Sequence, residues 1–409
     1  MKRRNFLVGT VSGLAVCANT EHVFAKALAQ PSLSGLPGAQ GRCLVLINLQ
    51  GGNDGLNCVV PHGDQRYYQV RPNLAIAQSD VLDVDARVGF NPMMRAFKAL
   101  YDKGAVAIVQ GVGYPGPSYS HFRSTEIWQT GVPDHYEHTG WLGRYFDDAP
   151  LPANNLFNGV AISQTLPEVL ASNHTDIPSI FNPAQYGLAF DRDAAMRLAF
   201  RNEARDTRLP FRSPYVARVM EIEDHAQRGS EELPKLIAGY KTQASYPASP
   251  LGRSLSLAAQ IIGSDLGTKV IYVEHGSFDT HQNQRAVQDR LLGQFSDAVS
   301  AFYDDLAVHG TDARVLTMTF SEFGRRIEEN GSRGTDHGEA SPLFLIGGGV
   351  KGGLYGEPPD LTNNNIGNVR FSTDFRSVYA TVLERWLVRP SAGVLGGTFA
   401  AIPVLGSPG

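Results

Sequence analysis

The chain of 409 residues has few cysteines, few tryptophans and little net charge. Three cysteines are too few for a disulfide-based scaffold. A net charge of −4 argues against a nucleic-acid-binding protein, which needs a strongly basic surface. No apolar run reaches the roughly 20 residues that cross a bilayer. Because hydrophobic residues make up 42% of the chain, we expect a globular protein with a large core, no nucleic-acid partner and no stable membrane anchor.

The first 29 residues are typical of an export signal. Arg3 and Arg4 precede a moderately apolar stretch at 6–18, and Ala27-Leu28-Ala29 offers small residues to a signal peptidase. The paired arginines predict export of the folded chain by the twin-arginine translocase, and a periplasmic or secreted location. The alternative is an N-terminal helix.

Two cysteines, Cys43 and Cys58, follow the predicted signal. They could form a disulfide in an oxidising compartment. However, Cys43 starts a predicted buried strand, where a cysteine is usually a free apolar residue.

Strand and helix patterns alternate along the chain. Apolar runs predict strands at 42–50, 105–110, 158–163, 269–274, 314–320 and 343–346. Helical periodicity predicts helices at 93–103, 194–205, 215–227, 231–240, 255–262, 284–308 and 374–387. Buried strands separated by helices imply an α/β fold with a mostly parallel central sheet and helices on both faces. We expect a signal peptide at 1–29 and one domain at 30–409, with a helical insertion at about 147–250.

Polar clusters follow the predicted strands, at the edge where open α/β sheets bind ligands. The first cluster is Gly51-Gly52-Asn53-Asp54-Gly55. Its glycines allow close approach of a ligand, and Asp54 offers oxygens to a hard cation or a sugar hydroxyl. The alternative is a turn stabilised by the Asp54 side chain. The motif lacks the spacing of a dinucleotide site.

The second cluster contains Ser120, which we predict to cap a helix that ends near Thr130. A hydroxyl at a helix N-terminus lies in a positive field, which suits a nucleophile that attacks a phosphate or sulfate. His121 and Arg123 could bind that anion. The alternative is a structural cap beside a solvated histidine.

Two further loops carry metal-ligand residue types. Asp279 and His281 follow a predicted strand, and their spacing places both side chains on one side of an extended segment. His337, flanked by Asp336 and Gly338, precedes the last predicted strand. The alternatives are a polar loop and a turn.

Glu322 is a carboxylate at the mouth of another predicted strand. The alternative to a ligand role is a salt bridge with Arg325 or Arg326. Polar clusters repeated at successive strand ends favour one shared site.

The five clusters together resemble a family of twin-arginine-exported bacterial proteins with no settled function, related to the alkaline phosphatase and sulfatase superfamily. The resemblance covers nearly the whole chain after the predicted signal, and it implies an alkaline-phosphatase-like fold. The matching segments are Gly51–Gly55, Ser120–Ser124, Phe278–His281, Ser321–Arg325 and Gly334–Gly338.

The resemblance also implies roles for single residues. Ser120, with Ser118 as a second candidate, matches the nucleophile. A first metal site would contain Asp279, His281 and His337, and a second would contain Asp54, Ser120 and Glu322. Where the superfamily has an Asp-His pair after a strand, this chain has Ser321-Glu322, so an imidazole is missing. Oxygen ligands in that second site would favour Ca²⁺, Mg²⁺ or Mn²⁺ over Zn²⁺.

These observations predict an exported, metal-dependent hydrolase or transferase of phosphate or sulfate esters. Its substrate would be a small anionic ester or a polysaccharide. Ser120 would attack, and His121 and Arg123 would orient the anion. One alternative, suggested by Glu322, is a non-catalytic periplasmic binding or scaffold protein that keeps the fold. Another is a hydrolase that uses Ser120 and a histidine without metal.

Overall fold

The computed structural model describes residues 41–149, 151–152, 155–183, 186, 195, 214–362 and 366–406. The predicted signal at 1–29 lies outside these residues, as does the predicted helix at 194–205 except for residue 195. Within the described ranges, no helix has both the length and the hydropathy needed to cross a membrane.

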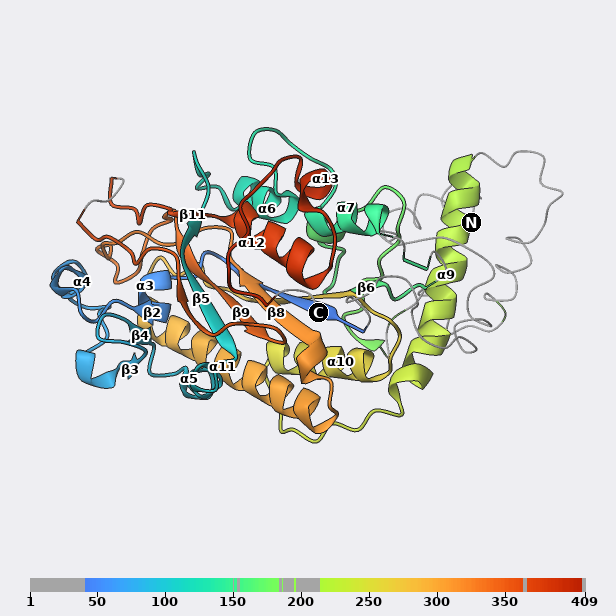
Figure 1. Ribbon diagram of the computed structural model, residues 1–409, viewed down its shortest axis with the longest axis horizontal. Coiled ribbons are helices and arrows are strands. Elements are labelled where there is room, and N and C mark those ends of the chain that lie inside the picture. The colour runs from blue at the N-terminus through green and yellow to red at the C-terminus, as the bar shows by residue number, and fades with distance from the viewer. Residues whose placement is uncertain are drawn as a thin grey trace.

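A central sheet of eight strands organises the molecule (Figure 1). Its order is β10 (Gly353–Tyr355), β5 (Val106–Gly113), β9 (Ser341–Gly347), β8 (Val315–Phe320), β1 (Cys43–Gln50), β7 (Val270–Gly276) and β6 (Gly159–Ile162), and β11 (Thr373–Asp374) pairs with β5. The pairs that β9 forms with β5 and β8 are antiparallel, and the other pairs of this sheet are parallel. The prediction of a mostly parallel central sheet is therefore confirmed.

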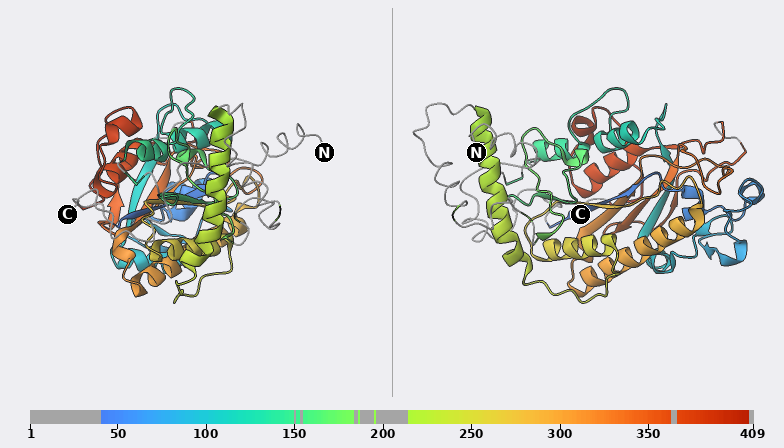
Figure 2. Two further views of the ribbon diagram at one scale, coloured as in Figure 1. Left: turned by 90° about the vertical axis from the view of Figure 1, so that its right-hand side faces the viewer. Right: turned by 180° about the vertical axis from the view of Figure 1, so that it is seen from behind.

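Helices cover both faces of the central sheet. The side chains of β1 alternate between these faces, and apolar side chains on each face must be buried against a helical layer. Val45 and Ile47 belong to the core that includes residues of α5 (Arg95–Asp102), α10 (Pro250–Gly263) and α11 (Gln284–Val308). Leu44 and Leu46 belong to the core on the other side, with α6 (His121–Thr130), α7 (Trp141–Asp148) and α12 (Phe375–Thr381). Figures 1 and 2 show these two helical layers with the sheet between them.

The middle of the chain differs from the prediction in two ways. The helices predicted at 215–227 and 231–240 are one helix, α9 (Pro214–Ile237). Pro234 removes one backbone donor but does not end the helix, since its carbonyl still accepts from the Ala238 amide at 3.1 Å. Within the predicted insertion at 147–250, β6 pairs with β7 and so belongs to the central sheet. The insertion itself stays a prediction.

Smaller elements complete the fold. A separate antiparallel sheet contains β2 (Val59–Val60), β4 (Gly89–Phe90) and β3 (Leu82–Asp83), and lies beside the short helices α3 (Gly55–Cys58) and α4 (Gln65–Val70) (Figure 1). The short helix α13 (Ser391–Leu395) follows α12. Cys43 and Cys58 are buried free thiols, so they form no disulfide with each other.

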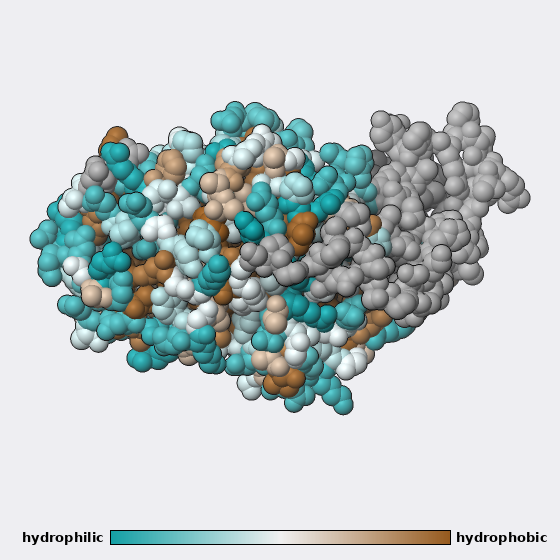
Figure 3. Space-filling model, viewed as in Figure 1, coloured by the Kyte–Doolittle hydropathy of each residue, from teal (hydrophilic) through white to brown (hydrophobic). Residues whose placement is uncertain are grey.

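The face drawn in Figure 3 has apolar residues scattered among hydrophilic ones, as expected for a surface in contact with water. The candidate residues named from the sequence gather at one edge of the central sheet. Because β1, β5, β7 and β8 run in the same direction, their carboxyl ends meet at one edge, where β9 begins. The five polar clusters predicted from the sequence follow or precede these strand ends.

Candidate metal centre

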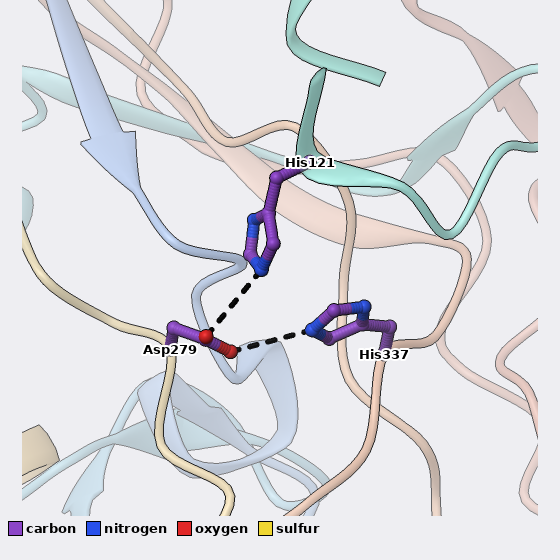
Figure 4. A group of neighbouring side chains, drawn as sticks. All are labelled: His121, Asp279 and His337. Atoms are coloured by element: carbon purple, nitrogen blue, oxygen red, sulfur yellow. Dashed lines mark hydrogen bonds and ion pairs between the residues drawn. The ribbon is translucent and has the colours of Figure 1, made fainter. Parts of the chain in front are cut away.

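His121, Asp279 and His337 converge at this edge of the sheet (Figure 4). They come from the first turn of α6, the loop after β7 and the loop before β9. One ligand atom from each residue lies within 4.8 Å of the others. The Nε2 atom of His121 is 3.4 Å from Asp279 Oδ2, and the Nε2 atom of His337 is 3.3 Å from Asp279 Oδ1.

His281 joins the same cluster. Its Nε2 atom lies 3.0 Å from Asp279 Oδ1 and 3.0 Å from His337 Nε2. Two imidazole nitrogens at this separation fit two ligands of one tetrahedral ion, whose bonds to nitrogen are about 2.0–2.1 Å long. The structure therefore brings together Asp279, His281 and His337, the residues that the sequence resemblance implies for a first metal site, and places His121 beside them.

The Nδ1 atom of each imidazole, on the side of the ring away from Asp279, lies near its own hydrogen-bond acceptor. His121 Nδ1 is 2.9 Å from Glu322 Oε1, His281 Nδ1 is 3.3 Å from Asp336 Oδ1, and His337 Nδ1 is 2.8 Å from the Tyr119 carbonyl oxygen. An Nδ1–H group that donates to such an acceptor leaves the Nε2 lone pair unprotonated and free to bind a metal. This arrangement is typical of histidine ligands.

Asp279 is held as an anion by a buried guanidinium. Arg325 Nη2 donates to Asp279 Oδ1 at 2.7 Å, and the Arg325 side chain is fully buried. Burial alone would raise the pKa of Asp279, but the hydrogen bond and charge of Arg325, with smaller contributions from His337 and His281, lower it to about 2. The carboxylate is thus ionised at any pH at which the imidazoles are neutral.

Two of the imidazoles have shifted pKa values of opposite direction. The hydrogen bond to Glu322 raises the pKa of His121, against a smaller effect of burial. Burial lowers the pKa of His337. The neutral form of His337, which binds metals, is therefore favoured.

This donor set fits a divalent transition metal. Imidazole nitrogens with one carboxylate are the ligands of many zinc sites, whereas calcium and magnesium prefer oxygen. Within the part of the chain described here, the ligand atoms of His121, Asp279 and His337 are close enough to share an ion, and His281 lies beside them.

Asp54, predicted as a ligand of the second metal site, is engaged with other protein groups. Its Oδ2 atom accepts from Arg71 Nη1 at 2.6 Å and from Gln284 Nε2 at 2.5 Å, and its Oδ1 atom caps α3 through the Leu56 amide. Both partners of the ion pair with Arg71 are buried. The structure thus supports the alternative of a stabilised turn, with a guanidinium beside the carboxylate.

Glu322, the other predicted ligand of that site, binds the rear of the His121 ring and the Gly51 amide, which lies 2.8 Å from its Oε1 atom. It also forms no ion pair with Arg325, because that guanidinium pairs with Asp279. Glu322 therefore fixes the orientation of the His121 ring.

Ser120 caps α6, as predicted, although its hydroxyl makes no capping hydrogen bond. Arg123 does not occupy the predicted anion-binding position. It pairs with Glu126, donates to the Pro133 carbonyl at 2.6 Å and stacks on the ring of Tyr136. Through these contacts the Arg123 side chain packs against the residues that follow α6.

The glycines of the first cluster serve the protein's own packing. Gly51 and Gly52 have φ values of +105° and +78°. A Cβ atom on Gly51 would approach the Asp279 amide to 2.5 Å, and one on Gly52 would overlap the Phe323 ring. The close approach predicted for a ligand is therefore made by the loop that carries Asp279.

Sequence reasoning did not place His121 beside Asp279, and it missed the contacts of Arg325 with Asp279 and of Asp336 with His281. His121 directly follows the predicted cap of the helix after β5, so its place at the sheet edge could have been inferred. Its rotation toward Asp279 depends on Glu322, which is distant in sequence.

Several solved structures are similar to the chain at low identity. The C-terminal periplasmic domain of EcEptC from Escherichia coli, in complex with Zn, is 11% identical, with 78% of this chain and 75% of that chain covered and a TM-score of 0.36. A protein in the alkaline phosphatase superfamily from Vibrio parahaemolyticus is 10% identical, with 87% and 71% covered and a TM-score of 0.34. Alkaline phosphatase from the Antarctic bacterium TAB5 is 12% identical, with 77% and 94% covered and a TM-score of 0.35.

Comparison with curated proteins gives no match. A family model described as a protein of unknown function (DUF1501) matches residues 105–392, which is more than half of the chain. The matched segment contains His121, Asp279, His281, Glu322 and His337. The chain therefore belongs to the DUF1501 family.

Proposed function

We propose that this protein is a hydrolase or transferase of phosphate or sulfate esters that uses one divalent metal ion. The ion would be held by Asp279, His281, His337 and His121. The observation that carries the proposal is the convergence of three imidazole Nε2 atoms on Asp279, each ring fixed from behind through Nδ1. When bound, a divalent ion supplies Lewis-acid stabilisation of negative charge on the ester oxygens.

The chain's own residues have distinct parts in this proposal. Ser120 is the nucleophile, because its hydroxyl is exposed at the N-terminus of α6, makes no capping bond and directly precedes His121. Arg325 keeps Asp279 ionised, and Glu322 orients His121. The serine would receive the phosphoryl or sulfuryl group while the ester alcohol leaves, and water or another alcohol would then release it.

We propose a single ion because both carboxylates expected in the second metal site bind other protein groups. Asp54 pairs with Arg71, and Glu322 binds His121. Nitrogen-rich ligation makes Zn²⁺ the first candidate. The Ca²⁺, Mg²⁺ or Mn²⁺ expected from an oxygen-only second site has no such support.

Export belongs to the proposal as well. The paired arginines at the start of the chain support a signal peptide at 1–29, passage through the twin-arginine translocase and a domain at 30–409 that works in the periplasm or outside the cell. A small anionic ester or an esterified polysaccharide would be met there.

The same observation on Asp54 and Glu322 favours the second candidate, a binding or scaffold protein that retains the fold and the ion without turnover. A metal-free hydrolase based on Ser120 is the third. Chelation separates them, since only the metal-dependent enzyme has activity that a chelator removes.

The test is to purify the protein, measure bound metal by mass spectrometry, and screen aryl phosphates, phosphodiesters and aryl sulfates. We expect about one metal ion per chain, turnover that Ser120→Ala abolishes, and loss of both metal and turnover in His281→Ala. His174→Ala, which removes an exposed imidazole away from the cluster, is the control and should change neither. Failure to bind metal, or metal binding without turnover of any ester, would contradict the proposal.

A further inference from the structure

We propose that Tyr114 is a positioning residue that fixes Ser120 beside His121. This inference rests on the proposed function, in which Ser120 attacks the ester. It starts from a buried phenol that bonds both to the segment that carries Ser120 and to the helix that carries His121.

The segment between β5 and α6, residues 114–120, is held by side-chain oxygens. It contains two prolines, which have no amide hydrogen, and a glycine in the left-handed region. The Ser118 amide donates to the Tyr114 hydroxyl at 3.0 Å, and the Ser120 amide donates to the Ser118 hydroxyl at 3.2 Å. The backbone that leads to Ser120 therefore depends on the Tyr114 phenol through one intermediate serine.

The Tyr114 side chain is a fixed point for this segment. It is only 3% exposed, and its ring lies 5.7 Å from the ring of Phe375 in an edge-to-face contact. Its hydroxyl lies 3.0 Å from the Oγ atom of Ser124, a fully buried residue of α6. Because close-packed side chains in a core have little freedom to move, the phenol holds the Ser118 amide in one place.

The direction of each hydrogen bond in this network follows from its ends. The Glu322 carbonyl can only accept, so the Ser124 hydroxyl donates to it. Ser124 then accepts from Tyr114, and Tyr114 accepts from the Ser118 amide, which can only donate. Burial raises the pKa of Tyr114, so the phenol keeps the proton that this order requires. The hydroxyls of Tyr114 and Ser124 thus each accept one bond and donate one.

The far end of the network is the residue that orients His121. The Glu322 Oε1 atom lies 2.9 Å from His121 Nδ1, and the carbonyl of the same residue accepts from Ser124. The Ser124 amide donates to the Ser120 carbonyl at 2.9 Å. Tyr114 and Ser124 therefore join the backbone on both sides of Ser120 to the residue that holds His121.

A fixed nucleophile matters because a displacement of about 1 Å can lower a rate by about 100-fold. The Ser120 hydroxyl makes no capping bond, so its place depends on the backbone before and after it. Tyr114 supports the backbone before Ser120, and α6 supports the backbone after it. The bond between Glu322 and His121 does not involve the phenol, so removing the phenol separates the placement of Ser120 from metal binding.

The experiment compares Tyr114→Phe with the original zinc-loaded chain. The substrates are para-nitrophenyl phosphate, the corresponding diester and the corresponding sulfate. The variant keeps the ring and removes the acceptor of the Ser118 amide. We expect kcat to fall by about tenfold while KM and zinc content stay unchanged, because the lost bond places the nucleophile and binds neither ester nor metal. Amide hydrogen exchange, followed by mass spectrometry, should become about tenfold faster at Ser118.

Tyr303→Phe is the matched control, because Tyr303 is also a buried phenol with two hydrogen-bond partners. Its hydroxyl lies 2.9 Å from Thr317 Oγ1 and 2.7 Å from the Ile346 carbonyl, away from the centre. This variant should lose stability as Tyr114→Phe does, without a change in kcat or in exchange at Ser118. A general loss of stability therefore cannot imitate the expected result.

Ser118→Ala gives a second test that leaves the buried phenol in place, so it applies even if Tyr114→Phe does not fold. It removes the bond to the Ser120 amide at a half-buried position. We expect kcat to fall by about threefold with KM unchanged, and exchange at Ser120 to become faster. Complete loss of turnover in this variant would identify Ser118 as the nucleophile and overturn the inference.

The outcomes separate this inference from the proposed function. An unchanged kcat in Tyr114→Phe, or an equal fall in Tyr114→Phe and Tyr303→Phe, would overturn the inference and keep the proposed function. If the original chain turns over no ester, the proposed function fails and hydrogen exchange decides the inference. Faster exchange at Ser118 in Tyr114→Phe would then support it, and equal exchange in the two chains would overturn it.

Discussion

Replacing Asp54 by alanine should destabilise the protein strongly without removing its metal. The Asp54 carboxylate and the Arg71 guanidinium are both buried and lie 2.6 Å apart. Arg71 also donates to Asn57 and to the backbone carbonyls of Arg326 and Ile327. Without Asp54, this guanidinium would keep those bonds but lose its counter-charge inside the protein.

The expected magnitude follows from that burial. Breaking a buried ion pair by removing one partner costs about 3–5 kcal/mol, because the remaining charge is left uncompensated. This is a large part of the roughly 5–15 kcal/mol by which proteins are stable. Asp54→Asn, which retains an acceptor for Arg71, should cost less. Asp102→Ala breaks the exposed pair with Lys98 and should cost under about 1 kcal/mol.

Urea unfolding followed by circular dichroism measures these free energies, and mass spectrometry of the folded variants measures bound metal. We expect Asp54→Ala to lower the free energy of unfolding while about one metal ion per chain remains. The reasoning is refuted if stability is unchanged, or if metal content falls from two ions to one, which would identify Asp54 as a metal ligand.

Three further outcomes follow from the same structure. Glu322→Ala should weaken metal binding by about 10–100-fold, because His121 loses the acceptor that orients it. Competition with a chelating dye measures this affinity. Glu328→Ala, at an exposed site, should have no effect. Burial lowers the pKa of His275 from 6.5 to about 4, so the folded state favours the neutral imidazole. The free energy of unfolding should therefore decrease as the pH falls from 6.5 toward 4, by about 2 kcal/mol between pH 6.5 and 5. A His275→Gln variant whose urea midpoint keeps the same pH dependence would contradict this. Gly51→Ala should lower stability by more than about 1 kcal/mol and weaken metal binding, because a Cβ atom at φ +105° meets the Asp279 backbone; unchanged unfolding and zinc titrations would count against that packing.

Much of the fold could be predicted from local sequence patterns. The apolar run that forms β1 and the periodicity that forms α11 are signals carried by consecutive residues, and the structure confirms both elements. The extent of α9 could not be predicted in this way, because Gly229 and Ser230 indicate an end that the helix does not have.

The site was predictable only in part. Polar clusters at the ends of parallel strands predicted one shared site, because such ends meet at one edge, and the family resemblance grouped Asp279, His281 and His337 within it. The roles of Asp54 and His121 depend on partners far away in sequence. Arg71 neutralises Asp54 and Glu322 turns His121, and neither pairing leaves a local pattern.

The most direct test of the metal centre is X-ray absorption spectroscopy of the zinc-loaded protein. We predict a first shell of about four ligands at about 2.0–2.1 Å, with multiple-scattering features of three imidazoles. A shell of oxygen atoms without imidazole, or an identical spectrum from the His281→Ala variant, would contradict the account.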